Sequence, residues 1–320
     1  MKKIVILHNK IEKNTSDELD VLAQKDLVHK SCVDLGFEVT ISTVGDDLKS
    51  DLEIVSSSKP DIVFNLVEAV WGMGELIYFA PAILNALKIP YTGVPLDALF
   101  LTTNKVLAKN IMMNNDLPTA PFFAINEIHL FKPQKKYIVK PIWEEASVGI
   151  SEDLIFTIDD SEKVNKIKRL AVSQYFIEEF IEGREFNVSM LSGKNGPEIL
   201  PPAEIIFSEY FKNRPKIVGY KAKWDETSEE YKHTNRSFET LDDNPLLKDK
   251  LIDICTRSWK TFNLHGYARI DFRVDDSGKI YILELNGNPC IAPDSGFIAS
   301  TEKAGYSKEE IINRILNDLN

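Results

Sequence analysis

The chain contains few cysteines and no long apolar run. Its three cysteines, Cys32, Cys255 and Cys290, are widely spaced and give neither a disulfide framework nor a metal-binding pattern. No apolar run approaches the ~20 residues that a membrane span requires. The start of the chain, Met-Lys-Lys-Ile-Val-Ile-Leu-His, has an apolar run too short for a signal peptide. These absences predict a soluble cytoplasmic protein with no membrane partner.

Positive charge is also scarce. The 320 residues include 38 Lys and Arg against 49 Asp and Glu, which gives a formal net charge of −11. Non-specific binding to nucleic acid needs an excess of basic residues, so no nucleic-acid partner is expected. A nucleotide such as ATP is not excluded, because it needs only local positive charge. With 43% hydrophobic and 10% aromatic residues, the chain is globular and long enough for two or three domains.

Strand and helix patterns alternate over the first ~95 residues, which predicts an α/β layer with a parallel sheet. Strands are expected at 3–8, 37–41, 61–67 and 89–93, and helices at 17–36 and 75–88. The second helix is apolar nearly all round, so we expect it to be buried and kinked at Pro81.

The pattern changes near residue 100, where a small α+β block begins. Helices are expected at 103–116 and 161–171, with strands near 137–140, 154–156 and 175–181. A last block contains a strand at 186–191, a polar stretch at 221–244 that is predicted to be a long loop, a helix at 246–262, and a final helix that a capping box at 307–310 opens. The predicted domains are 1–100, 101–181 and 182–320, so the fold class is α/β combined with α+β.

Residues 267–289 are predicted to form a β-hairpin. Apolar and polar residues alternate before a turn at 275–278, where Gly278 can adopt a positive φ, and a second apolar strand follows. If Val274 lies opposite Lys279, the register places Arg269 opposite Glu284.

In this register Asp271 lies opposite Ile282. Because side chains alternate between faces, a guanidinium, two carboxylates and an amide share one face of the hairpin. These groups belong to Arg269, Asp271, Glu284 and Asn286. Hard oxygen ligands beside a guanidinium suit Mg²⁺ with a phosphate chain. The alternative interpretation is a surface hairpin with a charged outer face.

Two other segments carry candidate nucleotide contacts. Lys140 ends an apolar strand and precedes a loop of small residues that reaches Gly149, so its ammonium and the loop N–H groups could hold phosphate oxygens. The segment 178–185 joins an apolar strand to a Gly-containing turn between carboxylates, which suits an adenine edge and ribose hydroxyls. Each segment alone is also compatible with a solvated lysine or an acidic surface turn.

Together these segments resemble the ATP-grasp ligases of the D-alanine–D-alanine ligase type. Residues 138–150 look like the phosphate loop of that family, and residues 176–188 look like its adenine hinge. Lys221-Ala-Lys-Trp224 looks like its mobile ω-loop signature, and 269–289 looks like its metal hairpin. With Ile89-Pro-Tyr-Thr-Gly93, the segments occur in the family's order and cover most of residues 60–300.

The resemblance implies a three-domain ATP-grasp fold, in which ATP and two Mg²⁺ ions, with Mn²⁺ as a substitute, lie between two α+β domains. By the resemblance, the phosphate contacts are Lys105, Lys140 and Ser147, and the adenine and ribose contacts are Glu178, Phe180, Ile181 and Glu185. The implied metal ligands are Asp271, Glu284 and Asn286. The implied catalytic residues are Lys223 at the γ-phosphate, Arg269 at the acyl phosphate, and Ser295 at the carboxylate of the second substrate.

The sequence departs from the family where the first amino acid should bind. The family's His-Gly after the third strand is Glu68-Ala69, and the serine and tyrosine of its substrate clamp are Ala146 and Trp224. Cys290 stands where the family has glycine after Asn-x-x-Pro, and the Gly-rich start is absent from residues 8–17. The resemblance therefore keeps the nucleotide and metal positions but changes the candidate substrate contacts Glu68, Trp224 and Cys290.

We therefore expect an ADP-forming ligase that joins a carboxylate to an amine through an acyl phosphate. Its substrates are expected to be an amino acid or small peptide other than D-alanine, with residues 221–244 as a closing lid over the intermediate. Two alternatives stay open: a true D-alanine–D-alanine ligase, and a nucleotide-binding regulatory protein that has lost ligation. The sequence does not fix the oligomeric state, and a homodimer stays open.

Overall fold

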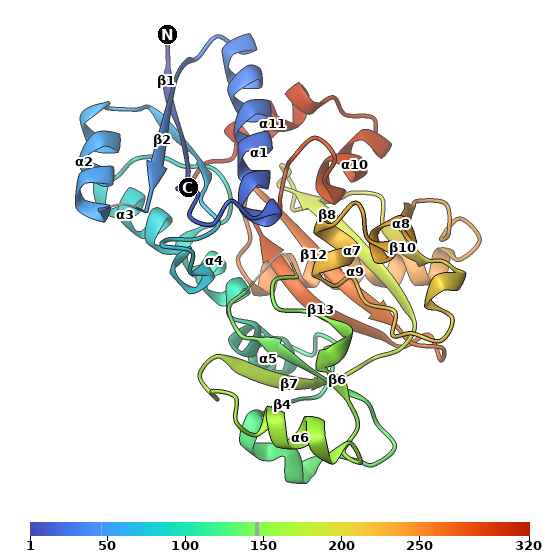
Figure 1. Cartoon of the computed structure of the whole chain (residues 1–320). Helices are drawn as coiled ribbons and strands as arrows, with labels where there is room; N and C mark the ends of the chain where they lie inside the picture. Colours follow the sequence, from blue (N-terminus) through green and yellow to red (C-terminus); the bar gives the residue numbers. More distant parts are fainter. Residues whose placement is uncertain (46, 145–146) are drawn as a thin grey trace.

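The computed structural model describes residues 1–45, 47–144 and 147–320, and these contain three separate β-sheets (Figure 1). The first sheet is parallel, with the order β2-β1-β3. Its strands are β1 (Lys3–Asn9), β2 (Glu38–Val44) and β3 (Ile62–Leu66). A parallel bridge between Val63 and Tyr91 brings the segment after residue 88 to the edge of β3. The predicted parallel α/β layer is confirmed.

Three helices accompany this sheet: α1 (Ser16–Asp34), α2 (Leu48–Ser57) and α3 (Phe79–Leu87). The expected kink at Pro81 is wrong. A separate 3₁₀ turn, η1 (Gly74–Leu76), precedes α3, and Pro81 lies in the first turn of α3. Proline is tolerated there because the first N–H groups of a helix have no intrahelical acceptor.

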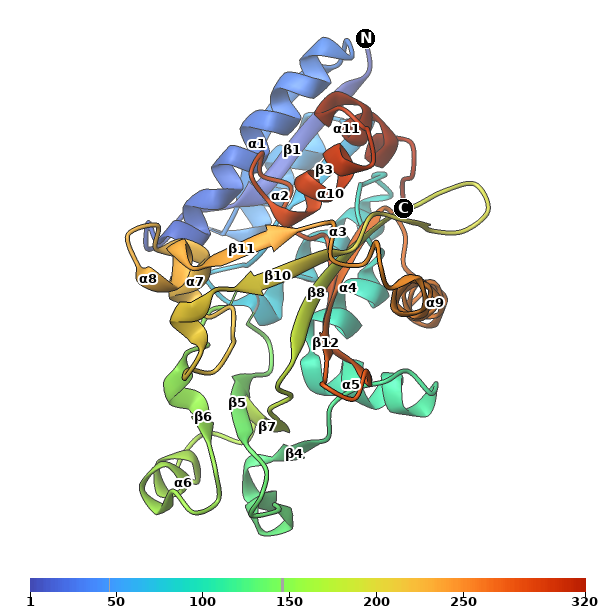
Figure 2. The same cartoon turned by 90° about the vertical axis from the view of Figure 1, so that its right-hand side faces the viewer.

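The second sheet is small and antiparallel, with the order β4-β7-β5-β6. Its elements are β4 (Phe122–Ala124), η2 (Ile125–Leu130), β5 (Tyr137–Pro141), η3 (Glu152–Leu154), β6 (Ile155–Phe156), α6 (Ser161–Ile167) and β7 (Tyr175–Glu179). Phe131, Tyr137 and Phe156 meet in its core, with the first two rings stacked 4.0 Å apart. Figure 2 shows this sheet and α6 at the far end of the molecule from α1.

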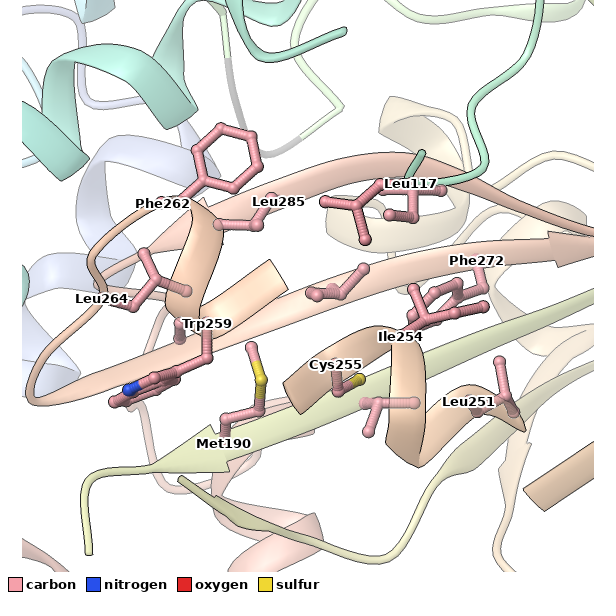
Figure 3. Packing of buried hydrophobic residues seen from close by; sticks show 14 of the residues in the cluster. Leu117, Met190, Leu251, Ile254, Cys255, Trp259, Phe262, Leu264, Phe272 and Leu285 are labelled. Carbon is pink, nitrogen blue, oxygen red and sulfur yellow. The ribbon is translucent and has the colours of Figure 1, made fainter. Parts of the chain in front are cut away.

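The third sheet is the largest and has the order β11-β10-β8-β12-β13, with β9 paired to β8. Its strands are β8 (Arg184–Leu191), β9 (Glu198–Ile199), β10 (Ala203–Phe207), β11 (Thr234–Ser237), β12 (Tyr267–Val274) and β13 (Ile280–Gly287), and η4 (Glu209–Phe211) follows β10. The helix α9 (Pro245–Thr261) covers one face. Figure 3 shows Leu251, Ile254 and Cys255 of α9 near Met190 and Phe272 of the strands.

Helices connect the regions that carry the three sheets. The helix expected at 103–116 is two helices, α4 (Leu96–Thr103) and α5 (Lys105–Asn114), because Asn104 caps α5 by accepting from Leu107 N–H. Both helices share the core of the third sheet. The helices α10 (Gly296–Lys303) and α11 (Lys308–Leu316) share a core with α1 and the first sheet. The predicted domain boundaries near 100 and 181 stay predictions.

The central hairpin forms as predicted, but its register is wrong. Arg269 lies opposite Asn286, Asp271 lies opposite Glu284, and a shift follows Asp271, so that Phe272 lies opposite Ile282. The predicted register would have put Ile282 on the polar face. The irregularity instead turns Ile282 into the core, where it is fully buried, and returns Glu284 to the polar face. The predicted shared polar face is therefore confirmed, although it arises from a register other than the predicted one.

The stretch 221–244 is not the featureless loop that was predicted. It contains most of α7 (Tyr220–Trp224), then α8 (Glu229–Lys232) and β11. These elements are too short to show a periodicity in the sequence. That residues 221–244 close as a lid over the intermediate remains a prediction. Among the described residues, no helix is both long enough and apolar enough to cross a bilayer.

Candidate functional site

Two adjoining cavities lie around the hairpin β12–β13. The hairpin cavity has a volume of about 350 Å³, and the N-terminal cavity has a volume of about 650 Å³. Predicted site residues that line only the hairpin cavity are Lys105, Lys140, Ser147, Glu178, Phe180, Ile181, Glu185, Asp271, Glu284 and Ser295. Glu68 and Asn286 line the N-terminal cavity, and Lys223, Trp224, Arg269 and Cys290 line both. The structure thus brings all these residues together; the remaining clamp position, Ala146, lies outside the described residues.

The polar face of the hairpin is a closely connected group. Arg269 donates two hydrogen bonds to Asp271, from Nε to Oδ1 and from Nη2 to Oδ2, each 2.8 Å long. Asn187 of the neighbouring strand β8 donates to the same Oδ1 at 2.7 Å. The amide of Asn286 lies 3.4 Å from oxygens of both Asp271 and Glu284. Asn187 was missed from the sequence, because only the β8–β12 register places it beside Asp271.

The pKa values of the two hairpin carboxylates, Asp271 and Glu284, are shifted in opposite directions. Burial opposes the ionised form of Glu284, but nearby cations outweigh burial and lower its pKa to about 2. These cations are Lys105, Lys140, Arg269 and Lys223. Burial raises the pKa of Asp271, although Arg269 opposes the rise. Glu284 is therefore an anion throughout the physiological pH range.

The donor set of the hairpin suits Mg²⁺, whose coordination is completed by phosphates and water, better than a metal ion whose ligands all come from the protein. Among the residues of the described ranges, no group of three or more His, Cys, Asp or Glu side chains could hold a metal ion. Asp271 and Glu284 offer two carboxylates, and Asn286 offers an amide. Mg²⁺ is usually held by one or two carboxylates together with substrate phosphates and water, so this donor set suits it.

A buried charge cluster lies beside the hairpin. The two oxygens of Glu178 on β7 contact two lysines: Lys140 Nζ lies 2.5 Å from Oε1, and Lys109 Nζ lies 2.7 Å from Oε2. Burial alone would raise the pKa of Glu178, but Lys109 and Lys140 outweigh it and hold that pKa below its usual value. Lys109 was missed from the sequence. Its spacing of one helical turn from Lys105 was the available signal.

The predicted ribose carboxylate is also paired. Arg273 donates from Nη2 to Glu185 Oε2 at 2.6 Å, and both side chains are buried. Burial raises the pKa of Glu185, and Arg273 opposes the rise. Arg273 also donates to the carbonyls of Gly183 and Lys216, which fixes the turn after Phe180 and Ile181. Arg273 was missed because its role depends on contacts across the sheet.

The loop before β6 and the segment that leads into α7 touch each other. Ser147 has a positive φ of 62° and donates from Oγ to the carbonyl of Val218 at 2.8 Å. Tyr220 donates from its backbone N–H to Ile150 O, and its hydroxyl donates to Asp17 Oδ1 of α1 at 2.7 Å. The start of α7 is thereby attached both to the predicted phosphate loop and to α1.

The N-terminal cavity has a different hydrogen-bond network. Gln24, a buried residue of α1, donates from Nε2 to Glu68 Oε1 at 2.8 Å and to Asp20 Oδ2 at 3.2 Å. The Cys290 thiol also donates to Asp20 Oδ2, at 2.7 Å. Burial is the main cause that raises the pKa of both Asp20 and Cys290. The thiol is therefore protonated at neutral pH, and a nucleophilic role for Cys290 has no support. Asp20 and Gln24 were missed from the sequence; one turn of helix separates them on the buried side of α1.

Ser295 occupies the N-cap of α10. Its Oγ accepts from the Ile298 backbone N–H at 3.2 Å, so the side chain is fixed at the helix terminus while it lines the hairpin cavity. The positive end of a helix favours an anion at such a position. The Lys223 ammonium lies 5.0 Å from the centre of the Trp224 ring, at the boundary of the two cavities.

Comparisons with known proteins agree with this geometry. A family model described as "D-ala D-ala ligase C-terminus" matches residues 112–317. A protein of Rickettsia canadensis (strain McKiel) named D-alanine–D-alanine ligase is 30% identical over 296 residues, which cover 90% of this chain and 76% of the relative.

Solved structures share the fold at lower identity. A D-alanine–D-alanine ligase from Bacillus anthracis, complexed with ATP, has a TM-score of 0.75 and 18% identity, and the match covers 99% of this chain and 97% of that one. The VanG D-Ala:D-Ser ligase from Enterococcus faecalis has a TM-score of 0.72 and 16% identity, with coverage of 99% and 98%. These structures confirm the predicted ATP-grasp architecture.

Proposed function

The chain belongs to the D-alanine–D-alanine ligase family of ATP-grasp enzymes, and from this premise we propose that it joins the carboxylate of one small molecule to the amine of another with conversion of ATP to ADP. The observation that carries the proposal is the hairpin cavity. Its carboxylates are held by fixed cations on both sides, and the cavity continues into a second, larger one. A nucleotide in the first cavity and an acid in the second would meet at Lys223 and Arg269.

The proposed nucleotide contacts follow from their places in the cavity. Phe180 and Ile181 form an apolar wall for adenine, with the Glu178 carboxylate beside them, and Glu185 faces the ribose. Lys105 and Lys140 supply positive charge for the phosphates, and Ser147 fixes the loop that approaches them. The Bacillus anthracis ligase is complexed with ATP, and Asp271, Glu284 and Asn286 are the proposed ligands of two Mg²⁺ ions in this chain.

In the proposed reaction, the carboxylate of the first substrate attacks the γ-phosphate of ATP, which yields an acyl phosphate and ADP. The amine of the second substrate then displaces phosphate and forms the amide. Both steps build negative charge on oxygens near Arg269 and Lys223, which stabilise it without reorganisation. Bound Mg²⁺ would add Lewis-acid stabilisation of the phosphate oxygens. Ser295 and the start of α10 are placed to hold the carboxylate of the second substrate.

The first substrate is proposed to be an amino acid or small peptide other than D-alanine. The N-terminal cavity, at about 650 Å³, offers room for a larger molecule. Its wall includes Glu68 and Asp20, which Gln24 connects. These two carboxylates are the proposed contacts for a cationic group on the substrate, in a cavity that Lys10, Lys13 and Lys223 also line. An indole N–H accepts no hydrogen bond, so Trp224 cannot replace a tyrosine hydroxyl that must both donate and accept.

A true D-alanine–D-alanine ligase is the second candidate, and the relative with 30% identity favours it. The VanG structure, described as a D-Ala:D-Ser ligase, shows that this fold serves more than one amino-acid pair. A regulatory nucleotide-binding protein is the third candidate, and it would bind ATP without turnover.

The three candidates are separated by a matrix of D- and L-amino acids and dipeptides, each supplied with Mg-ATP as acid and as amine. ADP formation that requires both an acid and an amine supports a ligase, and mass spectrometry of the mixture then identifies the amide. ATP binding with no ADP formation across the matrix would contradict the proposed function and favour the regulatory candidate.

A further inference from the structure

We propose that Lys109 is a positioning residue of the nucleotide site: it holds the Glu178 carboxylate in place and leaves Lys140 able to contact a nucleotide phosphate. The proposed reaction above makes no use of Lys109, and this inference rests on the proposed nucleotide site. Lys109 is 1% exposed, so it acts on a ligand through Glu178 and Lys140 and not by touching it.

Two buried lysines of helix α5 contact carboxylates of two different sheets. Lys105 and Lys109 lie one turn apart, so they share a face of the helix. Lys105 Nζ lies 3.7 Å from Glu284 of the hairpin in the third sheet, whereas Lys109 Nζ lies 2.7 Å from Glu178 in the second sheet. A single helix face thus places one cation at each side of the hairpin cavity.

A second contact fixes the ammonium of Lys109. It donates to Thr119 Oγ1 at 2.9 Å, and Thr119 forms a bridge with Ile282 of β13. The chain of contacts therefore runs from the metal hairpin through Thr119 and Lys109 to Glu178. Because Lys109 and Glu178 are buried and Thr119 is partly buried, Lys109 relates the position of Glu178 to that of the hairpin.

The charges at Glu178 explain why two lysines are needed. The carboxylate is 1% exposed and contacts one ammonium at each oxygen. A buried carboxylate without a cation is strongly unfavourable, so loss of Lys109 would hold Lys140 on Glu178. With Lys109 present, Glu178 remains paired when Lys140 turns to a phosphate. The two lysines and one carboxylate also leave a net positive charge for the triphosphate.

The test uses the full chain in four forms: wild type, Lys109→Met, Glu178→Gln, and the double variant. Calorimetry measures the dissociation constants of Mg-ATP and of Mg-tripolyphosphate, which has the phosphates but no adenine. Lys109→Met should raise both dissociation constants by at least about tenfold. In the Glu178→Gln background, where no carboxylate can hold Lys140, the same change should alter both by less than about twofold. Lys166→Met, which removes an exposed lysine that pairs with Glu162, is the matched control and should change neither.

Each outcome decides the inference. An unchanged affinity in Lys109→Met, a loss that persists in the Glu178→Gln background, or a loss for Mg-ATP but not for Mg-tripolyphosphate would overturn it. If Lys109→Met does not fold, the double variant, which removes both charges of the buried pair, still tests it: its affinities should match those of Glu178→Gln. A wild-type protein that does not bind Mg-ATP would instead contradict the proposed function itself.

Discussion

The hairpin cavity and the N-terminal cavity share four predicted site residues but are built differently. In the hairpin cavity the carboxylates are ion-paired: Asp271 with Arg269, Glu185 with Arg273, and Glu178 with two lysines. In the N-terminal cavity, Asp20 and Glu68 accept hydrogen bonds from the neutral amide of Gln24, and Asp20 also accepts from the Cys290 thiol.

This difference indicates which properties of the family this chain retains. Ion pairs fixed by two sheets preorganise a site for a charged ligand, and the residues of these pairs include the proposed nucleotide and metal contacts. Glu68 and Asp20 line the other cavity and are the proposed contacts for the first substrate. The comparison therefore predicts conserved nucleotide chemistry together with a changed choice of substrate.

The largest expected effect comes from Glu284→Gln in the hairpin cavity. Removal of this carboxylate takes away a proposed Mg²⁺ ligand at the transferring phosphate, so ADP formation should fall by about 10³-fold or more. The variant should stay folded, but its midpoint of thermal unfolding should fall, because the cations that hold the pKa of Glu284 at about 2 lose their anion. Rates are measured with saturating ATP and the best acid and amine.

Glu198→Gln is the matched control, because Glu198 pairs with Arg314 and lies outside the residues that line the two cavities. It should leave the rate unchanged. Wild-type turnover by Glu284→Gln at ordinary Mg²⁺ concentration would contradict the proposal that the hairpin cavity holds the metal and the nucleotide.

An intermediate effect is expected where α7 meets the N-terminal cavity. The hydrogen bond from the Tyr220 hydroxyl to Asp17 raises the pKa of Tyr220 to about 12 and ties the start of residues 221–244 to α1. Tyr220→Phe removes this tie, so the KM of the acid substrate should rise by roughly tenfold, while the dissociation constant of Mg-ADP stays unchanged.

Hydrogen exchange provides the second measurement of this prediction. Amides of 221–244 should exchange faster in Tyr220→Phe than in the wild type without ligands, and ATP with a substrate analogue should slow them in the wild type. Tyr306→Phe, which loses a similar hydrogen bond to Glu198, should behave like the wild type. Equal exchange in all forms and both ligand states would refute a gating role for these residues.

The smallest predicted effect is the pH dependence that Asp20 adds to the KM of a cationic substrate. Burial raises the pKa of Asp20 above 3.8, whereas the pKa of Glu284 is about 2. On acidification Asp20 therefore takes up a proton first and loses the negative charge that favours a cationic substrate. As the pH is lowered from about 7.5, the KM of such a substrate should rise more in the wild type than in Asp20→Asn, because only the wild type loses this charge. Identical profiles would show that Asp20 does not face the substrate.

Much of the hairpin cavity could be predicted from the sequence, because its motifs are local. The alternation of residues 267–274 gave the shared face of Arg269 and Asp271. The register was wrong because an irregularity after Asp271 leaves no clear signal in the sequence. The choice between burying Ile282 and exposing it is made by packing in the core that the third sheet shares with α4, α5 and α9, which the strand pattern alone does not contain.

The residues that support the site were harder to predict. Lys109, Arg273 and Gln24 act on predicted residues through contacts between different elements of the chain. A buried lysine or glutamine in a helix looks like an ordinary surface residue until its partner is known. The short elements within 221–244 were missed for another reason, since none spans enough residues to produce a period.

The most direct test of the central claim supplies D-alanine at high concentration with ATP and Mg²⁺ and measures the dipeptide, after calorimetry has established that the protein binds Mg-ATP. The hairpin cavity predicts nucleotide binding, and the N-terminal cavity predicts little or no D-alanyl–D-alanine, with faster ADP formation for a bulkier or cationic substrate. Efficient D-alanyl–D-alanine synthesis, comparable to the rate with any other amino acid tested, would contradict the claim that this cavity selects a different acid.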